Sequence, residues 1–181
     1  MSAVMATAKP QRKFATGRQM KIRDARDTDL PAIIRIYNAA IVTRISTAQL
    51  ETVTLDARAD WLNDHSPDRH PFWILEVGGD VAGWLTLKSF LPRAAYRDTA
   101  EVSVYVDEKF RRRGVGRALL AEAISRAPSL GIRAMVGLIF AHNAPSLRLF
   151  KELGFTKWGL LPGVAHLDDV ERDLTIMGWH A

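Results

Sequence analysis

The chain has 181 residues, of which 48% are apolar and 25% charged, and these proportions predict one globular domain with its own core. It has no cysteine, which excludes disulfides, thiolate metal sites and cysteine nucleophiles, and we expect a cytoplasmic protein. No apolar stretch approaches the roughly 20 residues that a membrane-spanning helix needs.

The net charge of +5 is concentrated at the N-terminus. Residues 1–19 contain four basic residues and no acid, which leaves a charge of +1 for residues 20–181. Nucleic-acid binding normally needs a basic face on the folded domain, so this distribution argues against that class. We expect residues 1–19 to form a disordered basic tail and residues 20–181 a single domain. A transit peptide, or a true start at Met20, would explain the composition of the tail as well.

The first half of the domain mixes strand and helix periodicities. In order, the expected elements are a strand at 20–26, a helix at 27–42, an irregular stretch at 43–51, a second helix at 54–66, and strands at 72–77 and 81–90. The last two strands are joined through Gly78, Gly79 and Asp80, which is a strong hairpin signal.

The centre of the chain is a strand at 98–106 that runs through a basic, glycine-containing turn into a helix at 117–127. One face of this strand carries Glu101, Ser103 and Tyr105, and the other carries Val102, Val104 and Val106. The turn consists of Arg111, Arg112, Arg113, Gly114, Val115 and Gly116. Free N–H groups at a helix start, the helix dipole and nearby arginines together favour a bound anion, and glycine permits close approach of the backbone.

The remaining elements complete a layered fold. They are a buried strand at 132–140, a helix at 143–153 and strands at 155–160 and 173–179. The order predicts an α/β (α+β) domain with a mixed central sheet of about seven strands flanked by four helices.

The pattern Arg111-x-x-Gly114-x-Gly116 between a strand and a helix resembles the acetyl-CoA pyrophosphate loop of the GCN5-related N-acetyltransferase (GNAT) superfamily. Further motifs resemble its phosphinothricin acetyltransferase group, namely Ile36-Tyr37-Asn38, Ala95-Tyr96-Arg97, Thr99-Ala-Glu101, Ser103-Val-Tyr-Val106, Asn143-x-x-Ser146 and Leu153-Gly-Phe155. The resemblance implies the acetyl-CoA N-acetyltransferase fold and a homodimer. It also implies direct acetyl transfer to the α-amino group of phosphinothricin, methionine sulfoximine, methionine sulfone or a similar amino acid.

The same resemblance implies roles for individual residues. Residues 111–116 would bind the diphosphate of acetyl-CoA, and the backbone of Val104, Tyr105 and Val106 would bind its pantetheine arm. Asn143 and Ser146 would contact the arm as well. As a helix cap Asn143 would look the same in sequence, so both readings stay open.

For the reaction itself, Glu101 is the expected base. An amine with a pKa near that of lysine is protonated at neutral pH, and a carboxylate can remove the proton. The alternative for Glu101 is an exposed ion pair with Arg97. Arg93, Tyr96 and Ser103 are expected to contact the substrate, with an arginine binding its carboxylate.

Two positions depart from the family pattern. Phe150 stands where relatives have tyrosine or histidine, so the group that protonates the leaving thiolate is unassigned. Residues 163–173 lack the aromatic stretch that helps form the pocket in well-studied members. The histidines show no metal-binding spacing, and we expect no metal; His166 with Asp168 and Asp169 reads as a polar turn.

Two other functions remain alternatives. The same fold could acetylate a protein or peptide amine, for which an open groove would be expected. A non-catalytic module could bind nucleic acid or CoA through the basic residues, but it would give Glu101 no role.

Overall fold

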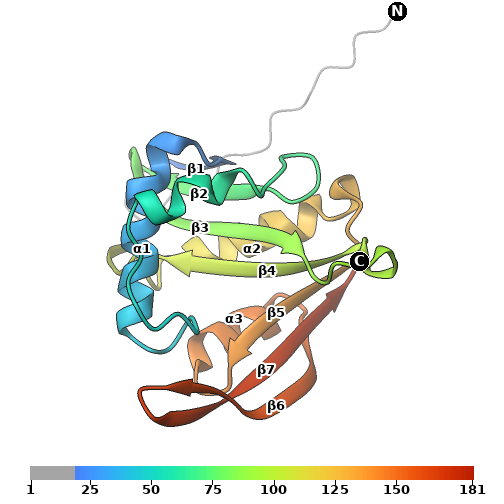
Figure 1. The fold of residues 1–181 in the computed structure, drawn as a ribbon. Coiled ribbons are helices and arrows are strands. Elements are labelled where there is room, and N and C mark those ends of the chain that lie inside the picture. The colour runs from blue at the N-terminus through green and yellow to red at the C-terminus, as the bar shows by residue number, and fades with distance from the viewer. Residues whose placement is uncertain (1–18) are drawn as a thin grey trace, which may run out of the picture.

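The computed structural model describes residues 19–181, apart from the side chains of residues 58–60 (Figure 1). The tail expected at residues 1–19 therefore lies outside the described part, except for Gln19. Within residues 19–181, no helix has the length and apolarity that crossing a membrane would require.

A seven-stranded sheet forms the centre of the domain, as the sequence predicts. Its order is β1-β2-β3-β4-β5-β7-β6, and only the β4–β5 pair is parallel. The strands are β1 (Met20–Asp24), β2 (Phe72–Val77), β3 (Asp80–Ser89), β4 (Thr99–Val106), β5 (Ala134–Phe140), β6 (Thr156–Leu167) and β7 (Val170–His180). The predicted hairpin joins β2 and β3, with Gly78 and Gly79 both at positive φ.

Three α-helices cover the two faces of the sheet. They are α1 (Leu30–Val42), α2 (Val115–Arg126) and α3 (Ala144–Glu152). Helix α1 lies on one face, and α2 and α3 lie on the other (Figure 1). The core between α2, α3 and the sheet contains Val102, Leu119 and Phe150, whereas Ile33 and Trp84 belong to the core under α1.

The expected second helix at 54–66 is a short 3₁₀ helix, Asp56–Leu62, so the described residues hold three α-helices rather than four. Its last two residues, Trp61 and Leu62, contact the core under α1, whereas Leu55, just before its start, is exposed. Among the side chains of this segment that the structure describes, there is no apolar stripe of the length that stabilises an α-helix by packing.

The C-terminal hairpin is longer than predicted. Strand β6 continues from Thr156 to Leu167, beyond the predicted end at residue 160, and β7 begins at Val170, before the predicted start at residue 173. The register shifts between Leu161 and Ala165, which interrupts the alternation of apolar and polar residues from which strands are predicted. The turn itself consists of Asp168 and Asp169, both at positive φ.

Candidate functional site

The central strands separate on one side of Glu101. Strand β4 pairs with β5 only from Thr99 to Glu101, and the last register pair is Glu101 with Val136. Both strands continue beyond this point, β4 to Val106 and β5 to Phe140. The two strands therefore leave an opening, which we call the β4–β5 opening.

The direction of the β4 backbone decides which groups face this opening. The Asp107 N–H donates to the Ala82 carbonyl oxygen on β3 (3.0 Å), and successive residues of a strand point their backbone groups to opposite sides. Tyr105 therefore directs its backbone to β3, whereas Val104 and Val106 direct theirs into the opening. Of the three residues expected to offer backbone groups, two face the opening; the backbone of Tyr105 does not.

The basic turn lies at the wide end of the β4–β5 opening. Helix α2 begins at Val115, two residues earlier than predicted, because Gly114 adopts a left-handed conformation (φ 82°, ψ 2°) as its N-cap. A Cβ on Gly116 would lie 3.1 Å from Leu149 Cδ2 and 3.5 Å from Val106 Cγ2. The contact with Leu149 would be tighter than ordinary packing, so glycine lets the start of α2 lie close to α3, with β4 at van der Waals distance. Arg111, Arg112 and Arg113 are exposed beside it.

Asp107 fixes the chain between β4 and the basic turn. Its buried side chain (2% exposed) accepts the Lys109 N–H (2.9 Å) and an Arg35 N–H from α1 (2.6 Å). Burial alone would raise the pKa of Asp107, but these two donors outweigh it, and the pKa lies below its ordinary value. The turn is therefore tied to α1.

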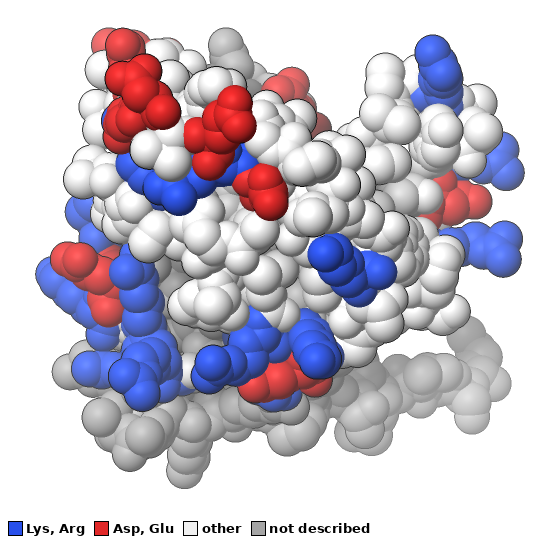
Figure 2. Space-filling model, turned by 90° about the horizontal axis from the view of Figure 1, so that it is seen from below, with Lys and Arg blue, Asp and Glu red and all other residues white. Residues whose placement is uncertain are grey.

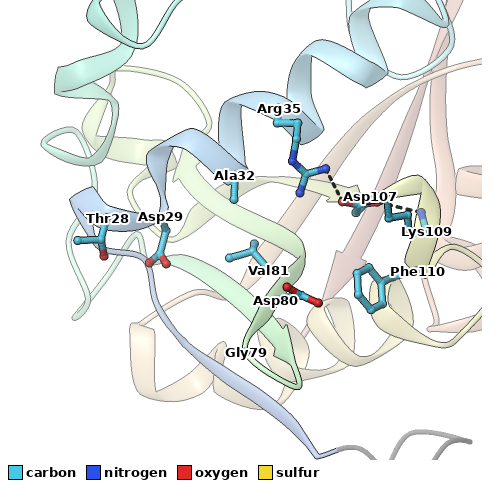
Figure 3. Close-up of a pocket in the computed structure, with 10 residues that line it drawn as sticks. All are labelled: Thr28, Asp29, Ala32, Arg35, Gly79, Asp80, Val81, Asp107, Lys109 and Phe110. Carbon is cyan, nitrogen blue, oxygen red and sulfur yellow. Dashed lines mark hydrogen bonds and ion pairs between the residues drawn. The ribbon is translucent and has the colours of Figure 1, made fainter.

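A cavity of about 370 Å³ lies beside this ion pair (Figure 3). It is lined from α1, the β2–β3 turn and residues 107–110, by Thr28, Asp29, Ala32, Arg35, Gly79, Asp80, Val81, Asp107, Lys109 and Phe110. The cavity contains neither Glu101 nor the residues of the β4–β5 opening, so it is separate from the candidate site.

Glu101 lies at the narrow end of the β4–β5 opening. Its carboxylate forms no hydrogen bond or ion pair with any residue that the structure describes. Arg97, the alternative partner, lies 3.6 Å from Asp98 instead. Burial raises the pKa of Glu101, and the positive charge of Lys88 partly offsets this. A half-buried carboxylate without a partner is suited to accept a proton near neutral pH.

Aromatic side chains form a wall on the same face of β4 as Glu101. Tyr105 stacks on Trp84 (4.3 Å between ring centroids) and meets Tyr37 edge-on (5.2 Å). The Tyr37 hydroxyl lies 2.9 Å from Thr47 Oγ1, and the Tyr105 hydroxyl donates to the Ser46 carbonyl oxygen (3.4 Å). Burial raises the pKa of Tyr105 well above its usual range, so the phenol stays protonated.

The segment 43–51 is held across this region by residues distant in sequence. The Asn143 side chain caps α3 by accepting the Ser146 N–H (3.2 Å), and its amide donates to the Ile45 carbonyl oxygen (3.2 Å). Arg44, at a positive φ of 54°, makes two hydrogen bonds to Asp168 in the β6–β7 turn. Asn143 therefore acts as the N-cap of α3, which is one of the two roles that the sequence left open.

The other predicted substrate residues lie at different places. Ser103 projects from the same face of β4 as Glu101, two residues further along the strand. Arg93 and Tyr96 flank an exposed 3₁₀ turn, Ala94–Tyr96, where Tyr96 packs edge-on against Phe90 (6.1 Å). The structure thus brings Ser103 near Glu101, whereas Arg93 and Tyr96 lie on the exposed connection between β3 and β4.

The structure also places Phe150 and the histidines that the sequence singled out. The Phe150 ring is 4% exposed and packs on Gly137 and against Phe155 (4.8 Å). Among residues 19–181, no three His, Asp or Glu side chains gather as metal ligands would. His166 lies 3.8 Å from Glu171 across the C-terminal hairpin.

Sequence reasoning missed several residues around Glu101, notably Trp84, Thr47 and Lys88. Trp84 looked like any core residue of a strand. Thr47 lies in a stretch without periodicity. Lys88 could have been found only from the β3–β4 register, which places it opposite Glu101.

Comparisons of the sequence and the fold with known proteins identify the family. A sequence model of the acetyltransferase (GNAT) family matches residues 33–155. The chain is 45% identical to the Bacillus subtilis protein YwnH, provisionally named a phosphinothricin acetyltransferase, over 88% of this chain and 98% of YwnH. It is 34% identical to the L-methionine sulfoximine/L-methionine sulfone acetyltransferase of Pseudomonas aeruginosa, over 86% and 91% of the two chains. The structure of yncA from Salmonella typhimurium with acetyl-CoA superposes with a TM-score of 0.84 at 34% identity, covering 89% and 93%. The chain belongs to the acetyltransferase (GNAT) family.

Proposed function

We propose that this acetyltransferase moves the acetyl group of acetyl-CoA directly to the α-amino group of a small amino acid or analogue, of the phosphinothricin, methionine sulfoximine or methionine sulfone type. The observation that carries the proposal is the β4–β5 opening, with the basic turn at one end and the unpaired carboxylate of Glu101 at the other. The names of the relatives support the substrate class.

The residues of the opening fit the coenzyme. Val106 lies five residues beyond Glu101 along β4, which is roughly 16 Å at 3.3 Å per residue and comparable with a phosphopantetheine arm. The diphosphate would lie on the first turn of α2 beside Arg111, Arg112 and Arg113. The arm carries amides, which Val104 and Val106 can bind as an added strand would.

Within this arrangement, acetyl-CoA supplies a reactive thioester. A backbone N–H facing the opening would donate to the thioester carbonyl oxygen and stabilise the negative charge that develops there. The Asn143 and Ser146 cap at the start of α3 would contact the arm through groups not already engaged with segment 43–51.

Glu101 would accept the proton of the substrate ammonium group, directly or through one water. An α-amine is largely protonated at neutral pH, and the raised pKa of Glu101 brings the base closer to the working pH. Ser103 would contact the substrate beside Glu101, and Arg93 and Tyr96 would contact it from the connection between β3 and β4.

The leaving thiolate needs no side-chain acid. Phe150 carries no exchangeable proton, but a thiol pKa near roughly 8.5 makes the CoA thiolate a fair leaving group. The thiolate can take its proton from solvent.

We also infer a cytoplasmic homodimer in which residues 20–181 act as one catalytic domain and residues 1–19 as a tail. The lack of cysteine supports the compartment. Edge strand β6 exposes Trp158, Leu160, Leu161 and Val164. Figure 2, which views the molecule from the side of β6 and β7, shows a broad area with few charged side chains. An exposed apolar edge of this kind favours association with a second copy.

The proposed function is tested by thiol release from acetyl-CoA. The panel contains methionine sulfone, methionine sulfoximine and phosphinothricin, together with polyamines and short peptides. Release with the amino-acid analogues is the expected result. Release with peptides alone would instead favour the protein or peptide acetyltransferase.

A further inference from the structure

Lys88 lies directly opposite Glu101 in the sheet. The β3–β4 register pairs Lys88 with Glu101, next to the pairs Thr86–Ser103 and Trp84–Tyr105. Residues paired in this way project from the same face, with Cβ atoms about 5 Å apart. Lys88 therefore projects from the face that carries Glu101 and the aromatic wall.

The two opposite charges do not neutralise each other directly. Within the described chain, the Lys88 ammonium group makes no ion pair with an acidic side chain, and the Glu101 carboxylate makes none with a basic one. Lys88 is exposed and Glu101 is half-buried. A cation and an anion thus lie opposite each other on one face of the sheet without a direct ion pair.

The charge of Lys88 nevertheless acts on this site. It lowers the pKa of Glu101 against the larger, opposite effect of burial. Burial chiefly lowers the pKa of His65, and Lys88 lowers it further. The ammonium group therefore lies close enough to influence both neighbours.

We propose that Lys88 binds the carboxylate of the acceptor, so that a zwitterionic α-amino acid bridges Lys88 and Glu101. The ammonium group of the substrate faces Glu101 and its carboxylate faces Lys88, in a charge-assisted hydrogen bond. The inference rests on the proposed function and narrows its substrate class to amines with a free α-carboxylate. Amines without that group, including polyamines, lose the contact.

Arg93 is the competing cation. It lies on the exposed turn after β3, four residues beyond Ser89, the last residue of that strand, whereas Lys88 is within the sheet and in register with the proposed base. The two residues therefore make opposite predictions for variants that remove one charge at a time.

The test compares Lys88→Met, Lys88→Arg and Arg93→Met with the unmodified enzyme. Each is assayed by thiol release with methionine sulfone and with its carboxamide, which keeps the amine and lacks the carboxylate. The quantity compared is the ratio of variant to unmodified kcat/KM for each substrate, because the amine of the carboxamide has a different pKa.

We expect Lys88→Met to lower kcat/KM for methionine sulfone roughly 10- to 100-fold, the range for losing a charge-assisted hydrogen bond. At a pH above the acidic limb of every profile, the value for the carboxamide should change less than about twofold, and Lys88→Arg should recover part of the loss for methionine sulfone. The acidic limb of the pH profile should move to higher pH in Lys88→Met, because the pKa of Glu101 rises without the neighbouring cation.

Two controls distinguish loss of the substrate contact in Lys88→Met from a change in the protein structure. The KM for acetyl-CoA and the thermal midpoint of Lys88→Met should match those of the unmodified enzyme, since Lys88 is exposed. Equal losses with both substrates, or a selective loss in Arg93→Met alone, would overturn the role of Lys88 and leave the proposed function intact. Activity of the unmodified enzyme with polyamines but not with methionine sulfone would overturn both.

Discussion

Gly114 offers a test of the basic turn in which backbone strain can be separated from steric crowding. Its φ of 82° is left-handed, and a Cβ at this position would meet nothing within 4 Å. The only cost of Gly114→Ala is therefore the backbone conformation, about 1–2 kcal/mol for a residue with a Cβ.

Gly79 in the β2–β3 turn is a matched control. Its φ is 93°, and a Cβ there would also meet nothing within 4 Å. Gly79→Ala should lose the same about 1–2 kcal/mol. For a domain of this size, Gly79→Ala should lower the thermal midpoint by about 2–8 °C, and Gly114→Ala should do the same where its alanine keeps the left-handed conformation.

Only Gly114→Ala should weaken coenzyme binding. If the alanine relaxes out of the left-handed region, acetyl-CoA must restore the turn, and the penalty cannot exceed the strain. At 1.4 kcal/mol per factor of ten, the KM for acetyl-CoA should rise about 5- to 30-fold. Steady-state thiol release at saturating amine measures this value. The strain appears once, either as a lower thermal midpoint of the free protein or as a higher KM. A Gly114→Ala variant with both values unchanged, or an equal rise of KM in Gly79→Ala, would refute the assignment of the turn to the diphosphate.

Three further variants test other parts of the account. Glu101→Gln should lower kcat/KM for the amine about 10²- to 10⁴-fold and leave the KM for acetyl-CoA unchanged. The unmodified enzyme should lose activity as pH falls through the raised pKa of Glu101, because the base must be ionised. Asp107→Asn should cost about 1–2 kcal/mol in urea unfolding, at the low end because Arg35 is 55% exposed. The pKa of Asp107 is lower in the folded than in the unfolded protein. The ionised carboxylate therefore stabilises the fold fully above the unfolded pKa, near roughly 3.9, and this stabilisation is lost as pH falls through the folded pKa. The stability of Asp107→Asn should not show this loss at low pH. Phe150→Ala should cost about 3–5 kcal/mol in the same assay, because the ring is buried against Gly137.

The elements that local patterns specify were predictable from the sequence. The seven strands, the β2–β3 turn and the strand–turn–helix around Gly114 follow from alternation, glycine placement and helix periodicity. These signals extend over a few residues, and the burial of one face is enough to enforce them.

Features that depend on distant contacts were not predictable. Arg44 and Asp168 are 124 residues apart, and their ion pair helps hold segment 43–51, which has no periodicity of its own. The place of Lys88 beside Glu101 depends on the β3–β4 register, which no local pattern states. The 3₁₀ helix at 56–62, in place of the expected α-helix, was likewise not predicted.

The β4–β5 opening itself was expected only from the family resemblance, and its backbone direction required the structure. Alternation of side chains was visible in the sequence, but which amides lack a strand partner depends on where pairing with β5 stops. Beyond that end point, the backbone groups of Val104 and Val106 face the opening and those of Tyr105 face β3.

The central claim is that these two amides receive the coenzyme, and amide hydrogen exchange followed by NMR tests it most directly. In the free protein, Val104 and Val106 should exchange faster than Val102 and Tyr105, although all four lie in the middle of the sheet. Saturating coenzyme A should slow exchange at Val104 and Val106 and leave Tyr105 unchanged. Slow exchange of both amides in the free protein, or no protection by coenzyme A, would contradict the claim.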